Sequence, residues 1–470
     1  MKVNISMGRI VRLFVALLFL PISHVAVAEN VILFLGDGMG ISTITAARIY
    51  AGQQQGLDGE EYNLAFDQFP NTALVKTYNT DSQVPDSAGT ISAILTGVKT
   101  RIGVIGVPPT ITRGDCQGSL EQRVPTILEL AEAAGYATGI VSTARITHAT
   151  PAGTYAHVPD RNWESDTVLP EAAKSQGCTD IAAQLVNFSE GDGIDVILGG
   201  GRGQFMLRNQ VDPEFPNSSG HRQDVDLIST WLKGAEERYY YWNQKGVEGF
   251  KPGPNKQLMG LFQPSHMQFE ADRENDPGGE PSLADMTELA IRQLSLNEKG
   301  FFLLVEGGRI DHAHHFGNAY RALVDTVAMS DAVKRAIEMT KARDTLTIVT
   351  ADHSHTLTIS GYPPRGNPIL GKVTINPVMP NAKDTIYTTL AYANGPGYQT
   401  PYPDLADVDT QSPDYRQLAA VPLAIETHAG EDVAAFAHGK NASSIRGVME
   451  QNKLFDAMHA VLFGAEASKH

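Results

Sequence analysis

Short apolar runs alternate with amphipathic stretches along most of this 470-residue chain. Apolar runs of four or five residues bounded by turn-forming residues are typical of strands buried on both faces. Such runs are Val31–Leu35, Ala137–Val141, Asp195–Leu198, Phe301–Val305, Thr345–Val349 and Val433–Phe436. Helical periodicity occurs in Thr126–Ala134, Asp285–Leu296, Tyr320–Thr340 and Ser444–Leu462. This alternation predicts an α/β fold with a largely parallel central sheet that has helices on both faces.

The first 28 residues do not follow this pattern. Three basic residues, Lys2, Arg9 and Arg12, precede the apolar run Leu13–Ile22, and Ala26-Val-Ala28 follows that run. That order is typical of a secretory signal peptide, and the run is shorter than the roughly 20 apolar residues that span a bilayer. We therefore predict a signal peptide over residues 1–28, export to the periplasm or the exterior, and one domain over residues 29–470.

Two stretches interrupt the alternation with many Pro, Gly and Asn residues. They are residues 365–425 and, less sharply, residues 205–280. Clusters of these residue types favour loops, so both stretches are predicted to be insertions at the rim of the sheet. The C-terminal segment, residues 465–470, is short and polar, and the apolar run before it is too short for a lipid-anchor signal. No membrane anchor is expected.

The charge balance limits the partners. The net charge is −16, and removal of residues 1–28, with three basic residues and no acidic ones, makes it −16 − 3 = −19. So acidic a protein binds nucleic acids and anionic membranes poorly, and an anionic substrate would need a local positive site. Cys116 and Cys178 are the only cysteines. In an oxidising compartment they predict one disulfide, with two free thiols as the alternative.

Polar residues collect where the predicted strands end. Asp37 follows the first strand, Glu306 follows Phe301–Val305, and Asp352 and His353 follow Thr345–Val349. In open α/β sheets, ligands bind outside the carboxyl ends of the strands. Three strand ends therefore direct carboxylate and imidazole groups toward one region, which predicts a site there.

The segment 306–315 favours a metal site. Five of its ten residues are acidic or His. Asp311 and His315 stand four apart, so on a helical turn they share a face and can hold one metal ion, whereas His314 would point elsewhere. Carboxylate and imidazole ligands suit zinc. A solvated charge cluster is the alternative.

Three further candidates are weaker when each is considered alone. Asp352 and His353 are adjacent, so they can share a metal only from a turn, and His428 is a lone histidine. Asp37 lies in Gly36-Asp-Gly-Met-Gly40, between a strand and a helix. Glycines there resemble a phosphate-binding dinucleotide loop, but the spacing lacks the further glycine of that motif, and a carboxylate inside the loop is better suited to holding a cation.

Ser87 is the candidate nucleophile. It lies in Val84-Pro-Asp-Ser87-Ala-Gly-Thr90, before the helix-like run Ile91–Leu95. The positive end of a helix dipole favours a serine alkoxide. Serine is also a preferred helix cap, and on position alone that structural role is the better explanation.

Taken together, four motifs resemble the alkaline phosphatase family, and more closely its animal branch. They are Val84-Pro-Asp-Ser87-Ala-Gly-Thr90, Val305-Glu-Gly-Gly-Arg-Ile-Asp311-His-Ala-His-His315, Thr350-Ala-Asp-His-Ser-His355 and Glu426-Thr-His-Ala-Gly-Glu-Asp432. Val196-Ile-Leu-Gly-Gly-Gly-Arg202 and Asn394-Gly-Pro-Gly-Tyr398 extend the resemblance over nearly the whole mature chain.

The resemblance implies hydrolysis of phosphate monoesters with broad specificity, two zinc ions, one magnesium ion and a homodimer. It implies that Ser87 becomes phosphorylated and that Arg161 binds two phosphate oxygens. The implied ligands are Asp37, Asp352 and His353 for the zinc at the nucleophile, Asp311, His315 and His428 for the other zinc, and Asp37, Thr150 and Glu306 for magnesium. His148 and His312 match positions behind these ligands, and Cys116 and Cys178 match an animal-type disulfide.

Two metals near each other can hold the attacking and the leaving oxygen of an in-line displacement. Arg161 adds a planar fork that suits phosphate. The animal enzymes also carry a calcium site, which Glu214, the carbonyl of Phe262, Gln263 and Glu280 resemble in part. Gln263 stands where a glutamate is expected and Glu280 where an aspartate is expected, so the calcium affinity is predicted to fall.

Three other functions compete with this one. A sulfatase needs a modified Cys or Ser in a Cys/Ser-x-Pro-x-Arg motif, and the sequence around Ser87 differs from it. A phosphodiesterase usually carries a threonine nucleophile and lacks the third metal site, which Thr150 and Glu306 imply here. A non-catalytic metal- or nucleotide-binding protein would need no nucleophile.

Overall fold

The computed structural model describes the chain apart from residues 2–27, 374–385 and 465–470. The predicted signal peptide and the polar C-terminal segment therefore lie outside the described residues, and so does part of the predicted insertion 365–425. Within the described part of the chain, no helix is long and apolar enough to cross a membrane.

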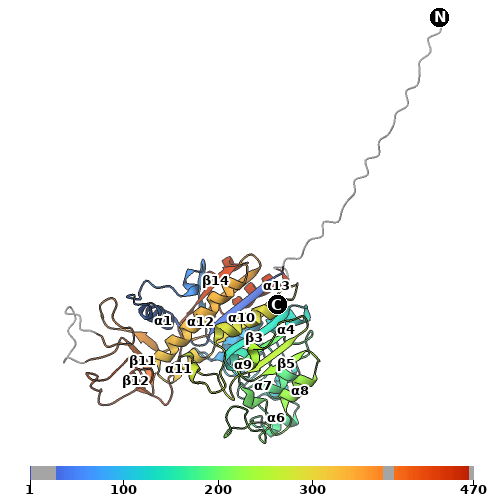
Figure 1. The fold of residues 1–470 in the computed structure, drawn as a ribbon, viewed down its shortest axis with the longest axis horizontal. Coiled ribbons are helices and arrows are strands. Elements are labelled where there is room, and N and C mark those ends of the chain that lie inside the picture. Colours follow the sequence, from blue (N-terminus) through green and yellow to red (C-terminus); the bar gives the residue numbers. More distant parts are fainter. Residues whose placement is uncertain (2–27, 374–385, 465–470) are drawn as a thin grey trace.

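A ten-stranded sheet forms the centre of the fold (Figure 1). Across the sheet the strands are β15 (Gly447–Glu450), β2 (Asn71–Lys76), β14 (Val433–Gly439), β8 (Thr345–Ala351), β1 (Asn30–Gly36), β7 (Phe301–Gly307), β3 (Ala137–Arg145), β4 (Val196–Gly200), β6 (Gln257–Leu261) and β5 (Arg238–Tyr241). The seven strands from β8 to β5 are mutually parallel. The predicted α/β class with a largely parallel sheet is confirmed.

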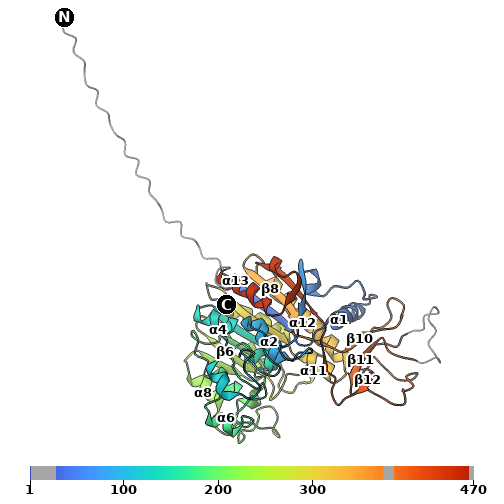
Figure 2. The same cartoon turned by 180° about the vertical axis from the view of Figure 1, so that it is seen from behind.

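Helices cover both faces of this sheet. The helices are α1 (Ile41–Gln54), α2 (Ser87–Thr96), α3 (Cys116–Glu121), α4 (Ile127–Ala133), α5 (Ala149–Ala152), α6 (Glu171–Ser175), α7 (Ile181–Val186), α8 (Leu227–Lys233), α9 (Gln244–Glu248), α10 (Leu283–Leu294), α11 (Arg309–His315), α12 (Ala319–Met339) and α13 (Lys453–Phe463). α10 and α12 pack on one face, and α4 and α13 pack on the other, as the two opposite views show (Figures 1 and 2). β1, β7 and β8 are buried along almost their whole length, as expected for strands between two helical layers.

The segment after β8 forms two small sheets. β10 (Leu357–Ile359), β11 (Leu390–Gly395) and β12 (Ala419–Pro422) make a three-stranded sheet, which lies at one end of the molecule (Figure 2). β9 (Ser354–His355) pairs with β13 (His428–Ala429). The second pairing brings His428 beside the end of β8, although the two segments are far apart in the sequence.

Two sequence predictions differ from the structure, and one strand has a direction that the sequence did not specify. β14 is antiparallel to both of its neighbours, β2 and β8. The predicted helix Ser444–Leu462 contains strand β15 before α13 begins at Lys453. Residues 205–280 were predicted to be a rim insertion, yet β5 and β6 extend the central sheet. In each case a strand partner distant in the sequence determines the structure, and local periodicity does not contain that information.

The disulfide prediction is confirmed. Cys116 and Cys178 are bonded, with their Cα atoms 6.0 Å apart and their positions separated by 62 in the sequence. They pack with Trp163 and Leu169 in a small apolar cluster.

Candidate metal centre and nucleophile

The carboxyl ends of β1, β7 and β8 carry three buried carboxylates, as the sequence predicts. Asp37 follows β1, Glu306 lies near the end of β7, and Asp352 follows β8; all three are fully buried. Burial, and then the nearby charges of Asp352 and Asp311, raises the pKa of Asp37 well above its ordinary value. Burial also raises the pKa of Asp352 and raises that of Glu306 to about 8. So many buried carboxylates are costly unless cations neutralise them.

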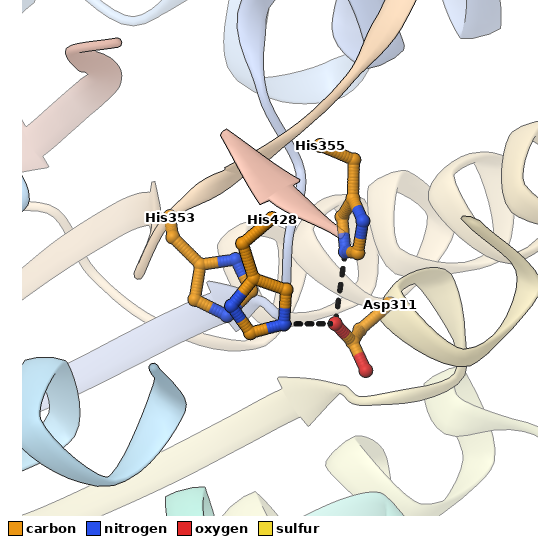
Figure 3. Close-up of side chains that lie close together, drawn as sticks. All are labelled: Asp311, His353, His355 and His428. Atoms are coloured by element: carbon orange, nitrogen blue, oxygen red, sulfur yellow. Dashed lines mark hydrogen bonds and ion pairs between the residues drawn. The ribbon is translucent and has the colours of Figure 1, made fainter. Parts of the chain in front are cut away.

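One group of ligand atoms converges on Asp311 from two separate segments. Asp311 and His315 share a face of α11, and His428 comes from β13. The distances from Asp311 Oδ1 to His315 Nε2 and to His428 Nε2 are both 3.3 Å, and the two Nε2 atoms are 3.3 Å apart. Figure 3 shows Asp311 and His428 directed toward each other.

The hydrogen bonds of the Nδ1 atoms of His315 and His428 determine whether their Nε2 atoms can bind a metal ion. His315 Nδ1 lies 2.6 Å from the carbonyl of Glu426, and His428 Nδ1 lies 2.9 Å from the carbonyl of Pro85. A carbonyl can only accept, so each Nδ1 carries the proton and each Nε2 keeps its lone pair. Two lone pairs and a carboxylate oxygen thus face one another at 3.3 Å. Four tetrahedral ligands about 2.0 Å from a zinc ion lie about 3.3 Å apart, so the residues fit a zinc ion.

A second group of ligand atoms lies around His353. Its Nε2 is 3.4 Å from Asp37 Oδ1, 3.3 Å from Asp352 Oδ2 and 3.2 Å from Ser87 Oγ. Burial lowers the pKa of His353 well below its ordinary value, so the ring is neutral and has a lone pair to offer. Both oxygens of Asp37 lack a hydrogen-bond partner within the described part of the chain. These spacings again match the edges of a zinc tetrahedron.

A third group offers oxygen atoms. Asp37, Thr150 and Glu306 are fully buried, and the Thr150 hydroxyl and Glu306 Oε1 have no partner among the described residues. Buried oxygens without hydrogen bonds are costly, and a hard cation such as magnesium satisfies such oxygens. His148 offers a ring nitrogen within 4.8 Å of the carboxylate oxygens of Asp37 and Glu306.

Ser87 is not the helix cap. Asp86 is the N-cap of α2 and accepts a hydrogen bond from the backbone N of Gly89 at 3.0 Å. Ser87 is the first helical residue, and its hydroxyl faces His353. The helix-cap role is therefore filled by Asp86. The Ser87 hydroxyl points into the group of candidate ligand atoms around His353.

Arg161 lies beside this serine. Its Nη1 donates to Asp86 Oδ2 at 3.1 Å, and its Nη2 lies 3.1 Å from His148 Nε2. Its side chain is 18% exposed, which leaves it open to a ligand from solvent. The predicted nucleophile and the predicted phosphate-binding arginine thus share one neighbour, Asp86.

Two residues of the site carry no role in the sequence analysis. His355 Nε2 lies 2.8 Å from Asp311 Oδ1, and its Nδ1 lies 2.5 Å from Glu426 Oε2 (Figure 3). Burial opposes the charged form of His355, but Glu426 and Asp311 outweigh it and raise its pKa to about 10. His355 is therefore a charged donor to Asp311. The sequence signal for His355 is its position directly after His353 and Ser354. Its partners Asp311 and Glu426 lie 44 and 71 residues away in the sequence, so spacing does not indicate these contacts.

The remaining predicted histidines are also placed. His314 points away from the ligands, as predicted, and contacts Thr43 Oγ1 at 3.0 Å and the hydroxyl of Tyr392 at 2.7 Å. The ring of His312 lies 5.4 Å from that of His148 and 4.0 Å from that of His266. Burial lowers the pKa of His312 well below its ordinary value, so it is neutral.

The residues that resemble a calcium site lie around Asp276, which interacts with Glu214, Gln263 and Glu280. Glu214 Oε2 accepts from Arg202 at 2.5 Å, and Gln263 donates to Asp276. Glu280 accepts from the backbone N of Gln268 at 2.8 Å, and Phe262 is buried.

Comparisons with known proteins cover nearly the whole chain. The family model described as alkaline phosphatase matches residues 28–463. The rat alkaline phosphatase, tissue-nonspecific isozyme, is 47% identical over 451 residues, which cover 93% of this chain and 84% of that protein. An alkaline phosphatase of Gadus morhua is 45% identical over 440 residues, which cover 92% and 91% of the two chains.

Solved structures show the same fold. The alkaline phosphatase from the Antarctic bacterium TAB5 aligns with a TM-score of 0.64 and 24% identity, over 93% of this chain and 98% of that one. The alkaline phosphatase of Thermus thermophilus aligns with a TM-score of 0.66 and 23% identity, over 95% and 96%.

Proposed function

This chain belongs to the alkaline phosphatase family of hydrolases, which act on phosphate monoesters, and from that premise we propose that Ser87 is the nucleophile of a two-step hydrolysis of many different monoesters. The observation that carries the proposal is the position of the Ser87 hydroxyl, 3.2 Å from His353 Nε2 and within a group of ligand atoms spaced as around zinc.

In the first step, Ser87 Oγ attacks phosphorus, the bond from phosphorus to the ester oxygen breaks, and a phosphoserine and an alcohol result. In the second step, water attacks the phosphoserine, inorganic phosphate leaves and the serine hydroxyl is restored. Ser87 is the first residue of α2, so the positive end of the helix dipole favours its alkoxide. Asp86 caps the helix and fixes this serine in place.

Arg161 would bind two non-bridging phosphate oxygens. Two of its five N–H groups contact Asp86 and His148, which leaves three for a phosphate. A planar guanidinium matches the geometry of a phosphate dianion and orients phosphorus toward Ser87 Oγ.

The metal ions proposed for the site are two zinc and one magnesium. Asp37, Asp352 and His353 would hold one zinc, Asp311, His315 and His428 the other, and Asp37, Thr150 and Glu306 the magnesium. When bound, such ions lower the pKa of a coordinated hydroxyl and stabilise the negative charge on oxygen. His355 and Glu426 orient Asp311, since the chain of contacts from Glu426 through His355 ends on its Oδ1.

We propose a weaker calcium site than in animal relatives, because Arg202 already neutralises Glu214 and Gln263 brings no charge. Calcium analysis of the purified protein tests this: a stoichiometric, tightly held ion would contradict it.

The proposal extends to the whole chain. Residues 1–28 would direct export to the periplasm or the exterior, and residues 29–470 would form one catalytic domain. The protein would be a homodimer. Val421, Leu423 and Ile425 support that proposal, since they are 51%, 42% and 55% exposed at and after β12, the edge strand of the small sheet. Contiguous exposed apolar side chains are typical of an interface. Analytical ultracentrifugation tests it: a monomer at micromolar concentration would contradict it.

Hydrolysis of a chromogenic phosphate monoester tests the function itself. Purified protein with zinc and magnesium should release phosphate, and Ser87→Ala should lower turnover by several orders of magnitude. Thr96→Val is a suitable control, because Thr96 lies on the same helix and its hydroxyl contacts backbone groups of Ser92 and Val98. Turnover by Ser87→Ala at the wild-type rate would contradict the proposal.

A further inference from the structure

A polar cavity opens next to the proposed site. Its volume is about 720 Å³, and residues lining it include Arg145, Glu164, Gln204, Arg208, His221 and Ser265. This volume lies within the range of small-molecule sites. None of these residues belongs to the three groups of metal ligands, and no step of the proposed hydrolysis uses them.

Arg208 supplies an unpaired positive charge to this cavity. Its side chain is exposed, and its Nε donates to the carbonyl of His221 at 3.1 Å. Among the described residues, the ion pairs include none with Arg208, so no carboxylate matches its charge. In a protein with a net charge of −16, an unpaired guanidinium in a cavity is a favourable place for an anion.

Arg145 contributes differently. Its Nε and Nη2 each donate to Glu164 at 2.7 Å, and its Nη1 lies 3.3 Å from Ser265 Oγ. Glu164 therefore cancels the charge of Arg145, and the net positive charge of the pair of arginines rests on Arg208. Gln204 and His221 also line the cavity. Burial lowers the pKa of His221, so its ring is neutral, and its Nδ1 donates to Gln204 Oε1 at 3.2 Å; the pair therefore adds no charge to the cavity.

A short series of contacts joins this cavity to the phosphate-binding arginine. Arg161 Nη2 lies 3.1 Å from His148 Nε2, and the rings of His148 and His266 are 5.3 Å apart. His266 Nε2 is 2.5 Å from Arg145 Nη1, and Arg145 lines the cavity. Asn162, which follows Arg161 in the sequence, lines it as well. The cavity is therefore linked to Arg161 through His148, His266 and Arg145, and it includes Asn162, the next residue in the sequence.

We propose that this cavity binds a second anionic group of the substrate, a phosphate carried at the far end of the leaving group. The inference rests on the proposed function, because it places the scissile phosphate at Ser87 and Arg161. Guanidinium groups bind phosphate by paired, charge-assisted hydrogen bonds. Substrates with a second phosphate at the right distance are therefore favoured over the same alcohols with only one.

The test compares alkanediol bisphosphates of increasing chain length with the matching hydroxyalkyl monophosphates, using the metal-loaded enzyme. The wild type should prefer the bisphosphate at an intermediate chain length. Arg208→Ser should lower kcat/KM for that bisphosphate about ten-fold, as expected for one charge-assisted hydrogen bond, and leave the monophosphates unchanged. Arg343→Ser is the matched control: it removes the same charge from a side chain that is 77% exposed, before β8 and away from the carboxyl ends of the strands.

The outcomes separate the two ideas. If the wild type hydrolyses no monophosphate, the proposed function itself fails. If it hydrolyses both classes but shows no preferred chain length, or if Arg208→Ser lowers both equally, the second binding position is refuted. A free anion is the other source of the same chemistry, so inhibition by inorganic phosphate is measured in parallel. A change confined to that inhibition constant would show that the cavity binds free phosphate and not the substrate, which also overturns the proposal.

Discussion

Replacing Arg161 by serine should remove most of the discrimination between phosphate monoesters and diesters. A monoester dianion offers three non-bridging oxygens, two for the arginine fork and one for the metal side of the site. A diester has one of these blocked by its second ester group, so it should gain less from Arg161.

The structure gives the magnitude. Arg161 has three N–H groups beyond its contacts with Asp86 and His148, so it can make two charge-assisted bonds to phosphate. Each contributes about 1.5–3 kcal/mol, and together they correspond to a loss of roughly 10²–10⁴ in monoester kcat/KM. The side chain is 18% exposed, and access of water places the loss near the lower end of that range.

The same contacts indicate that the variant folds. Without Arg161, Asp86 still accepts from the backbone N of Gly89 and of Gly103, both at 3.0 Å, so the start of α2 keeps its cap. The assay is kcat/KM for one monoester and one diester with the same leaving group, in the wild type and in Arg161→Ser. An equal fractional loss for both substrates would refute the reasoning, because it would mean that Arg161 adds only general positive potential.

Further predictions concern the metals, the disulfide and one buried carboxyl. Dialysis against a chelator should abolish activity, zinc should restore most of it and magnesium should increase it further; full activity with no metal by elemental analysis would contradict the proposed centre. Replacing Cys116 and Cys178 by serine should destabilise the protein by up to about 4 kcal/mol in the loop-entropy model, measured by urea unfolding; an unchanged midpoint would contradict this. Burial raises the pKa of Glu132 to about 9 in the folded protein, whereas the pKa of an unfolded glutamate is about 4.3. Between these two pH values the folded protein holds a proton that the unfolded chain has released. Stability should therefore fall as pH rises through that window, and Glu132→Gln should flatten the slope in unfolding of the metal-free protein; an unchanged slope would show that other groups cause it.

The central strands and the pair of candidate metal ligands Asp311 and His315 could be predicted because their sequence signals are local. Phe301–Val305 is an uninterrupted apolar run, and β7 begins at Phe301 as predicted. Asp311 and His315 are four residues apart, and this spacing places them on one face of α11. The convergence of Asp37 and Asp352 followed from the general rule for strand ends in α/β sheets.

The parts that could not be predicted depend on partners distant in the sequence. His428 was a weak candidate alone, and only the pairing of β13 with β9 brings it to Asp311. His355 and Glu426 hold Asp311 through contacts that no spacing rule contains. The sequence could not show whether Ser87 is a nucleophile or a helix cap. The answer depends on whether Asp86 or Ser87 accepts the hydrogen bond from the Gly89 N–H, and the structure shows that Asp86 does.

Direct detection of the phosphoenzyme tests the central claim most closely. The metal-loaded protein is incubated with a phosphate monoester, quenched in acid and digested, and the peptides are mapped by mass spectrometry. The account predicts one phosphoserine, at Ser87, in the wild type and none in Ser87→Ala. A phosphoserine at another position, or turnover with no phosphoenzyme under conditions that preserve it, would contradict the account.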